Sequence, residues 1–498
     1  MFKLAANESQ LEEMKLIDAV ERLGLGYHFE EEIEEALLRM YESPIKPNYD
    51  NDVNFSALQF RLLRQHGFNA SPDNSPSNHL LPHSSPYIKW KTTKKDDTGN
   101  FQATLISDWQ GMLSLYEAAH LSVEGEGILD EAITFTNLNL NSMMANLSAS
   151  DARQVQHALD LPLHKGIPRL EARHYISVYE EDRTRNETIL ELAKLDFNMW
   201  WKDIDVASKF PFARDRLVES YYWALGVYFE PMYSFGRLLI AKLIAILTIV
   251  DDIYDIYGTS EELHLFTEAI ERWDNGAIDR LPEYMRLCFQ EVMDIFFETE
   301  DWMTREGNPN HLCYLIREMK ALIKAYFVEA RWFNEKYFPR REEYLCNSWS
   351  GGSVYPLLTV ASFISMGDVA TKEAFDWVSI RPKLLTSSGL IVRLTNDIRS
   401  KKEVKRGHDA SAVQCYMKEN KASKVEACEY LENLIRLAWK DINKDVLKPA
   451  ALPFPFLMRT LNLARLAEVI YHHGDEFTRS AGRTKENIAK LLVHPILL

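Results

Sequence analysis

The sequence predicts an all-α protein. Apolar side chains recur at intervals of three to four residues in segments 10–24, 29–43 and 130–147, which is typical of helices that bury one face. Alternation of apolar and polar residues, which would indicate strands, never extends beyond a few positions. No short-period repeat indicates a solenoid. We therefore expect helices nearly throughout the chain.

Two polar stretches organise the chain, whose 498 residues are enough for two or three domains. Residues 71–101 are rich in Ser, Pro, Asn and Asp, and we expect a long connection there. The polar turn YEEDRTRNET, residues 179–188, precedes the apolar segment ILELAKLDF. A boundary in this turn gives an N-terminal domain of residues 1–182 and a C-terminal domain of residues 183–498. All candidate catalytic residues follow it.

Composition and charge exclude several classes of partner. The formal net charge of −16 disfavours nucleic acids and anionic membranes, since both require a basic surface. The five cysteines are scattered and form no CxxC pair, which favours a reducing compartment over a disulfide framework or a zinc site. Residues 1–25 resemble neither a signal peptide nor a transit peptide. Lys242 interrupts the short apolar stretch 238–250, so we expect no stable membrane insertion. We also predict a cytoplasmic location and a monomer.

The first candidate site lies in IAILTIVDDIYDIYG, where an apolar run ends in Asp251, Asp252 and Asp255. On a helix, Asp251 and Asp255 lie one turn apart on the same face, and their like charges are mutually destabilising. Close to a buried surface the repulsion grows unless a cation compensates it. The segment is therefore either a solvated helix end or a metal site.

A second polar cluster, RLTNDIRSKKEVKRG, follows another apolar run. At about 100° per residue, Asn396, Ser400 and Glu403 fall within an arc of roughly 60° on one helix face. Their oxygen atoms are hard ligands that suit Mg²⁺ or Mn²⁺ rather than zinc. Arg393 lies one turn before Asn396 on the same face and could bind a phosphate through its guanidinium group.

A third element is the segment 210–231, in which Arg214 and Arg216 precede an aromatic-rich helix. The aromatic rings could stabilise a cation, and the arginines could bind an anion beside it. Each feature alone is more often a solvated helix face or a core segment. In combination they predict an apolar pocket closed by divalent metal ions and a diphosphate group. The aromatic residues are Tyr221, Tyr222, Trp223, Tyr228 and Phe229.

At these positions the sequence resembles the plant terpene synthases, most closely the angiosperm sesquiterpene synthases. The segments FARDRLVESYYWALGVYFEPMYS, IVDDIYDIYGTSEELHLFTEAIERWD, RGHDASAVQCYM and AWKDIN resemble those of the family and occur in the same order. The resemblance covers nearly the whole chain. It implies two helical domains: an N-terminal helical barrel, shortened at its start and catalytically silent, and a C-terminal metal-binding domain with the class I terpenoid synthase fold.

The resemblance also implies a site. Three Mg²⁺ ions, for which Mn²⁺ could substitute, would be held by Asp251, Asp252, Asp255, Asn396, Ser400 and Glu403. A small-molecule prenyl diphosphate would be bound by Arg214, Arg216, Trp223, Asp251, Asp255, Gly351, Gly352, Ser353, Arg393 and Asn396. The residues expected in the chemistry itself are Asp251, Asp252, Asp255, Arg214, Arg216, Tyr471 and Asp475.

The glycine pair in SWSGGSVYPLL should weaken or break a helix there. The resemblance implies that this break turns backbone carbonyl groups toward the substrate cation; the alternative is an ordinary kink. Pro356 in the same segment favours an irregular helix.

The implied reaction is a Mg²⁺-dependent lyase reaction: ionisation of farnesyl diphosphate, cyclisation of the carbocation to a sesquiterpene, and release of diphosphate. Two alternatives remain, namely a monoterpene synthase that uses geranyl diphosphate and a catalytically impaired, truncated paralogue. Several departures from the family pattern favour the second alternative. Glu403 follows Asn396 by seven residues rather than eight, the helix after Asn198 is shortened, an N-terminal segment is missing, and Phe477 replaces a family tyrosine.

Overall fold

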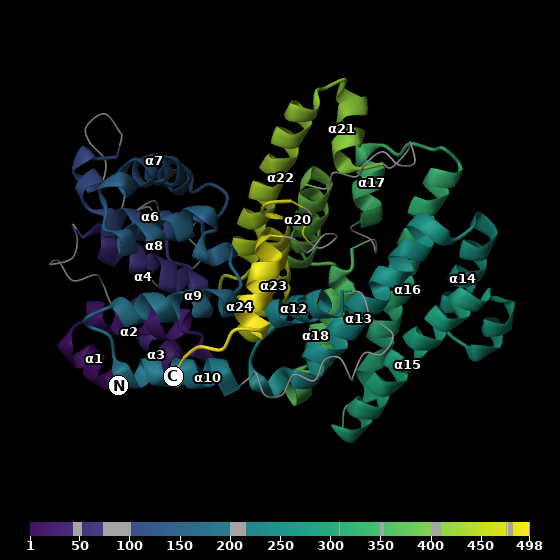
Figure 1. The fold of residues 1–498 in the computed structure, drawn as a ribbon, viewed down its shortest axis with the longest axis horizontal. Helices are drawn as coiled ribbons and strands as arrows, with labels where there is room; N and C mark the ends of the chain where they lie inside the picture. The colour runs from purple at the N-terminus through teal and green to yellow at the C-terminus, as the bar shows by residue number, and fades with distance from the viewer. Residues whose placement is uncertain are drawn as a thin grey trace. The chain divides into compact units, whose positions relative to one another are not determined.

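The computed structural model describes residues 1–42, 52–72, 101–199, 216–307, 309–348, 353–399, 410–474, 476 and 482–497. The described residues form helices joined by turns, and none of them forms an extended strand (Figure 1). The all-α prediction is therefore confirmed. The expected long connection at 71–101 lies largely outside the described residues.

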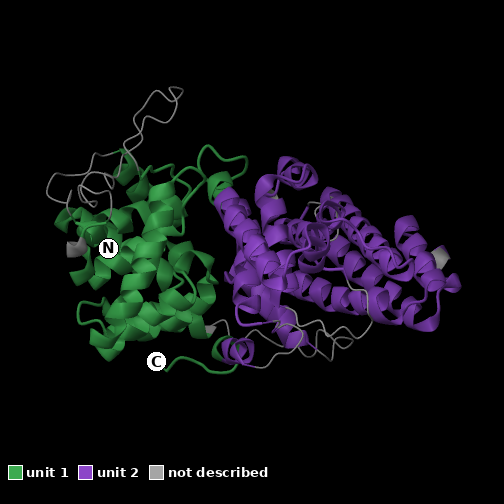
Figure 2. Ribbon diagram, turned by 90° about the horizontal axis from the view of Figure 1, so that it is seen from above, with its two compact units in different colours: residues 1–202, 443–454, 490–498 green, residues 203–442, 455–489 purple. Residues whose placement is uncertain are grey.

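The chain divides into two compact units, which Figure 2 colours separately. The first unit comprises Met1–Lys202, Asn443–Phe454 and Lys490–Leu498, and the second comprises Asp203–Ile442 and Pro455–Ala489. The first unit thus extends 20 residues beyond the boundary proposed from the sequence at 182. It also contains two short segments from the C-terminal part of the chain.

The first unit is a compact group of helices. Three of them confirm the predicted helices at 10–24, 29–43 and 130–147. Polar side chains cap several N-termini; Ser9, for example, accepts a hydrogen bond from the backbone N–H of Glu12 at 3.2 Å. The helices are α1 (Phe2–Glu8), α2 (Gln10–Arg22), α3 (Glu30–Glu42), α4 (Val53–Gln65), α6 (Trp109–Ala119), α7 (Gly127–Met143), α8 (Ala149–Asp160), α9 (Pro168–Glu181) and α10 (Glu187–Met199).

The second unit contains longer helices, and α13 contacts α12, α15 and α18. Its helices are α12 (Leu217–Val227), α13 (Ser234–Asp252), α14 (Ser260–Arg272), α15 (Glu283–Arg305), α16 (Leu312–Asn334), α17 (Arg341–Asn347), α18 (Tyr355–Ile364), α19 (Lys372–Ser379), α20 (Lys383–Arg399), α21 (Ala412–Asn420), α22 (Lys424–Asp445), α23 (Phe454–Tyr471) and α24 (Arg483–Leu492). The last residues of α22 and of α24 belong to the first unit.

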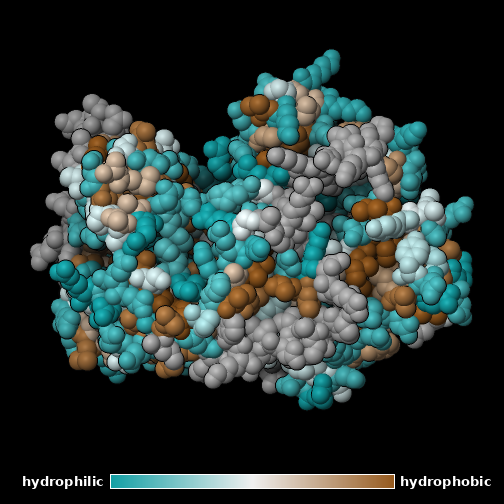
Figure 3. All heavy atoms as spheres, viewed as in Figure 1, coloured by the Kyte–Doolittle hydropathy of each residue, from teal (hydrophilic) through white to brown (hydrophobic). Residues whose placement is uncertain are grey.

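One helical run, Pro231–Tyr257, is long and apolar enough to cross a membrane by the criteria of length and composition. The run has 27 residues, a mean hydropathy of 1.8, and 61% of its apolar window is buried inside the protein. The core helix of a soluble protein passes the same test, so this result alone is weak evidence for insertion. Most of the visible surface is hydrophilic, and its hydrophobic residues lie in separate groups (Figure 3).

Candidate active site

The three aspartates lie where α13 ends. The side chains of α13 are mostly buried up to Val250, whereas Asp251 and Asp252 are exposed. A π-helical turn, η8 (Ile253–Tyr257), follows and carries the exposed Asp255. Such turns are rare and occur frequently at functional sites. The structure thus confirms an apolar helix that ends in three solvent-facing carboxylates.

The backbone after the π turn is fixed by local interactions. Gly258 closes the turn, since its N–H donates to the carbonyl of Ile253 at 2.8 Å. A Cβ atom on Gly258 would lie 2.4 Å from a side-chain carbon of Leu263 and 2.9 Å from the carbonyl oxygen of Ile253, so a larger residue would force these groups to shift. Thr259 and Glu262 then form a capping box that begins α14. The motif is therefore held between a buried helix and a capped one.

Helix α16 links this acidic end to the second predicted cluster. Burial, together with the negative charges of Asp251, Glu329 and Asp255, raises the pKa of Tyr326 on α16 well above its usual value. The positive charge of Arg393 on α20 opposes this rise. The ring centroids of Tyr254 in η8 and Tyr326 in α16 lie 6.0 Å apart, and Arg393 Nη2 of α20 lies 2.9 Å from Glu329 Oε2 of α16. The turn η8, α16 and α20 therefore meet near Tyr326.

Arg393, predicted to bind diphosphate, lies in a network of hydrogen bonds and ion pairs. Its Nη2 is 2.9 Å from Glu329 Oε2, and its Nε donates to the hydroxyl of Tyr344 at 2.5 Å. Its Nε also lies 3.9 Å from Asp397 Oδ1. Burial lowers the pKa of Arg393, but the charges of Glu329, Tyr344 and Asp397 raise it by a larger amount. The resulting pKa lies well above the usual value, so the guanidinium is held in its charged form.

Asp397, next to the predicted ligand Asn396, connects neighbouring helices. Its side chain is 4% exposed, and its Oδ2 accepts hydrogen bonds from the Tyr344 hydroxyl at 2.9 Å and from the backbone N–H of Ala412 at 2.8 Å. This carboxylate therefore joins α17, α20 and the start of α21.

The remaining described site residues belong to several elements of the second unit. Trp223 on α12 and Tyr471 at the end of α23 are each 6% exposed. Arg216 has a left-handed backbone conformation, with φ at 71°, immediately before α12. Ser353 lies against α20, because a Cβ atom on Gly389 would be 3.1 Å from its hydroxyl oxygen.

Several predictions cannot be placed. The predicted helix break at Gly351 and Gly352 lies outside the described residues; α17 ends at Asn347, and α18 begins at Tyr355. Pro356 lies in the first turn of α18, where a missing N–H costs no intrahelical hydrogen bond; its role is to begin a helix rather than to distort one. The site residues outside the described part of the chain are Arg214, Gly351, Gly352, Ser400, Glu403 and Asp475.

The donor atoms of the described site fit a hard divalent cation. Asp251, Asp255 and Asn396 offer carboxylate and amide oxygens, the ligands that Mg²⁺ prefers. Within the described ranges, no group of three or more His, Cys, Asp or Glu residues is close enough to hold a metal by itself.

Sequence reasoning missed Tyr326, Glu329 and Tyr344. A signal for the first two exists: Glu329 is an acidic residue within the apolar and aromatic run YFVEARWF, three residues after Tyr326 and therefore on the same helix face. Tyr344 carried no comparable signal, because a tyrosine in a short helix is usually a core residue.

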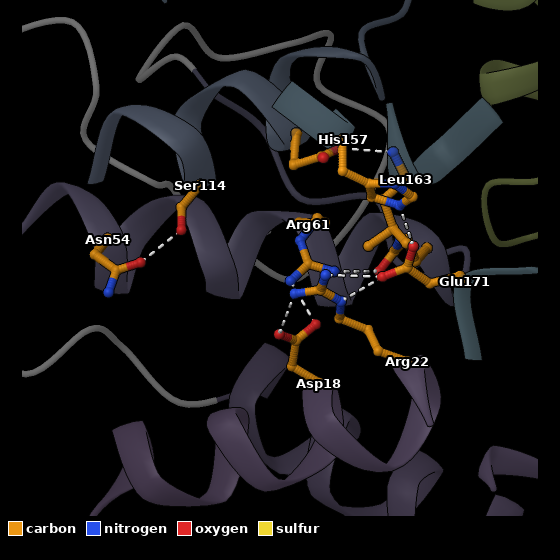
Figure 4. A network of polar contacts seen from close by, with 10 residues as sticks. Asp18, Arg22, Asn54, Arg61, Ser114, His157, Leu163 and Glu171 are labelled. Atoms are coloured by element: carbon orange, nitrogen blue, oxygen red, sulfur yellow. Dashed lines mark hydrogen bonds and ion pairs between the residues drawn. The ribbon is translucent and has the colours of Figure 1, made fainter. Parts of the chain in front are cut away.

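The first unit has its own polar cavity, of about 170 Å³, lined by residues of α2, α4, α6, α8 and α9. Its charged groups pair with one another (Figure 4). Arg22 Nη2 is 2.7 Å from Glu171 Oε1, and Arg61 Nη2 is 2.6 Å from Asp18 Oδ1. His157 Nε2 lies 2.8 Å from Glu171 Oε2. The cavity is therefore an internally compensated network.

Comparison with known proteins identifies the class of protein. Residues 202–441 match the metal-binding domain of the terpene synthase family, and residues 1–74 and 92–159 match the terpene synthase N-terminal domain. The chain therefore belongs to the terpene synthase family, whose members are lyases that act on prenyl diphosphates.

The chain is similar to two enzymes from Vitis vinifera. It is 46% identical to (−)-germacrene D synthase and 47% identical to valencene synthase, with 99% of this chain and 88% of each relative covered. Its fold is similar to that of isoprene synthase from grey poplar in complex with three Mg²⁺ ions and dimethylallyl-S-thiolodiphosphate, with a TM-score of 0.83, 37% identity, and 98% and 93% of the two chains covered. For limonene synthase with 2-fluorolinalyl diphosphate, the TM-score is 0.86 at 33% identity, with 98% of this chain and 91% of that chain covered.

Proposed function

We propose that this terpene synthase is a Mg²⁺-dependent sesquiterpene synthase that converts farnesyl diphosphate into a cyclic C15 hydrocarbon and diphosphate. The observation that carries the proposal is that η8, which follows Asp251 and Asp252 and carries Asp255, packs on α16, and that Arg393 of α20 is ion-paired with Glu329 of the same helix. Acidic and basic side chains thus belong to neighbouring elements, as required to bind metal ions and an anionic group together.

The relatives favour farnesyl diphosphate over shorter substrates. Germacrene D synthase and valencene synthase, whose names refer to sesquiterpenes, are 46% and 47% identical to this chain, whereas limonene synthase is 33% identical. Three Mg²⁺ ions accompany a diphosphate analogue in the isoprene synthase structure, which supports three ions here. We propose that Mn²⁺, which accepts the same oxygen ligands, can substitute for Mg²⁺. The five free cysteines support a reducing compartment, and we propose a cytoplasmic location and a monomer.

The proposed division of labour follows from residue chemistry. Asp251, Asp255 and Asn396 would hold the metal ions, which neutralise the leaving diphosphate and so favour cleavage of the allylic carbon–oxygen bond. Arg393 would bind a diphosphate oxygen through a charge-assisted hydrogen bond. The buried ring of Trp223 would stabilise the carbocation through its electron-rich face, and Tyr471 would accept or relay a proton at the end of the reaction.

A product assay tests the proposal. The purified protein is incubated with Mg²⁺ and farnesyl diphosphate, and separately with geranyl diphosphate, and the volatile products are analysed by gas chromatography and mass spectrometry. Cyclic C15 products that disappear in an Asp251→Ala/Asp255→Ala variant and with EDTA would support it. C10 products alone would replace it by the monoterpene alternative. Absence of products from protein that is folded by circular dichroism would favour the impaired paralogue.

A further inference from the structure

We propose that Tyr344 is a positioning residue, which orients the guanidinium of Arg393 so that one of its edges faces the diphosphate. The inference rests on the proposed function, since it assigns Arg393 to the diphosphate. It concerns a residue of α17 that lies in a helix separate from both metal-binding motifs.

The ring of Tyr344 is held firmly. The residue is 1% exposed and belongs to a hydrophobic cluster that also includes Leu394 of α20 and Ala412 of α21. A side chain packed in this way loses its rotational freedom on folding, so its hydroxyl group has a fixed position relative to α20. Burial also raises the pKa of Tyr344 well above its usual value. The hydroxyl group therefore stays protonated and can donate a hydrogen bond.

The hydroxyl group connects two charged side chains. It donates to Asp397 Oδ2 at 2.9 Å and accepts from Arg393 Nε at 2.5 Å. Its hydrogen is thereby committed to Asp397, and its oxygen lone pair is directed toward Arg393. A phenylalanine at this position would keep the ring and its packing but would lose both hydrogen bonds.

The consequence for Arg393 is a defined orientation. A guanidinium group presents a side edge, formed by Nε and Nη2, and an end edge that includes Nη1. Tyr344 takes Nε, and Glu329 takes Nη2 at 2.9 Å, so the side edge is occupied by protein groups. Among the described residues, Nη1 makes no hydrogen bond or ion pair. The end edge is therefore the part of Arg393 that can meet an oxygen of the diphosphate.

The experiment is a double-mutant cycle read by calorimetric titration of inorganic diphosphate into the full-length protein with Mg²⁺. Three variants are compared with the unaltered chain: Tyr344→Phe, Arg393→Gln and the double variant. If Tyr344 acts through Arg393, Tyr344→Phe weakens diphosphate binding about tenfold, as expected for a hydrogen bond to a charged group. It then has little further effect when Arg393 is already absent.

A matched control separates positioning from simple destabilisation. Tyr314 of α16 also donates its hydroxyl to a carboxylate, that of Asp376, at 2.7 Å, far along the chain from either motif. Tyr314→Phe should leave diphosphate affinity unchanged. Equal melting temperatures of the two variants, or a correction for their difference, complete the comparison.

The outcomes are distinct. Unchanged affinity in Tyr344→Phe, or effects that add fully in the double variant, would overturn the positioning role while the proposed function stands. No binding of diphosphate by the unaltered, folded chain would overturn both. A tenfold loss in Tyr344→Phe that vanishes in the Arg393→Gln background would establish the positioning role.

Discussion

In the N-terminal unit, Glu171 is 7% exposed, and its carboxylate is paired with Arg22 and His157. In the C-terminal unit, Asp251, Asp252 and Asp255 are all exposed and lie within five residues at the end of a buried helix. Both regions concentrate charge beside apolar helices. They differ in burial, since Glu171 is buried and the three aspartates are exposed.

The difference follows from the cost of burying charge. An ionised group that is removed from water must be paired within the protein, or its pKa shifts until it is neutral. The N-terminal network meets this requirement with its own arginines. The aspartates at the end of α13 face solvent, where they can remain charged and receive metal ions from solution. One cluster therefore stabilises a fold, whereas the other is suited to bind a ligand.

The largest expected effect tests whether the exposed aspartates of the C-terminal unit bind metal ions. We expect Asp251→Asn combined with Asp255→Asn to lower the rate of product formation by about 10³-fold, because two metal-binding carboxylates are lost. The melting temperature should stay constant or rise, since two like charges on one face are removed. Activity is measured by the product assay and stability by thermal unfolding. Asp301→Asn on α15, also exposed, serves as the control and should keep full activity. Activity within tenfold of the unaltered chain would contradict the assignment.

The next largest effect tests whether the buried N-terminal network stabilises the fold. Glu171→Gln should lower the free energy of unfolding by about 3 kcal/mol, because it leaves the charge of Arg22 without its main partner. Activity per folded molecule should not change. Urea denaturation at neutral pH measures the loss. The matched control is Glu181→Gln, which removes the exposed pair with Arg153 and should have no measurable effect. Equal effects of the two substitutions would show that burial is irrelevant to this network.

A pH dependence sharpens the comparison further. Burial raises the pKa of Glu117, which lines the N-terminal cavity, from 4.5 to about 7, although Arg61 and the N–H of Leu163 oppose the rise. The folded state therefore binds this proton more tightly than the unfolded state does. The contribution of protonated Glu117 to the free energy of unfolding is fully present below pH 4.5 and is lost as the pH rises through 7.

We expect the unaltered chain to lose about 2.5 kcal/mol relative to a Glu117→Gln variant between pH 5 and pH 8, since each pKa unit of the shift corresponds to about 1.4 kcal/mol. The glutamine keeps an oxygen that can accept the hydrogen bond from Leu163, which is 2.8 Å away in the glutamate form. Urea denaturation at the two pH values measures the difference. A constant difference between the two proteins would show that Glu117 titrates normally.

The smallest effect concerns the support of the aspartate motif. Thr259→Ala removes the capping box of α14 and should cost about 1 kcal/mol of stability. Thr259→Ser, which preserves the hydroxyl group, should retain most of it. Thermal unfolding distinguishes the two. A loss of activity beyond what the lower stability explains, measured per folded molecule, would show that the cap also positions Asp255.

Much of this protein was predictable because local patterns agree with the final structure. The helices at 10–24 and 29–43 follow their apolar spacing, and the aspartates end α13 as the run IAILTIVDD indicates. Pro356 was interpreted wrongly, because a proline in the first turn of a helix looks the same in sequence as one within it. The partnership of Glu329, Tyr344 and Arg393 was not predictable, since it joins residues 15 to 64 positions apart.

The sequence by itself determined the helical class, the family and the residue types of the metal motifs, since these depend on periodicity and short spacings. Only the tertiary structure decided which charges are compensated inside the protein and which face solvent. The physical reason is that burial and Coulomb interactions depend on distance in space. Asp397 illustrates this: its carboxylate accepts hydrogen bonds from Tyr344 and Ala412, which lie 53 and 15 positions away in the chain.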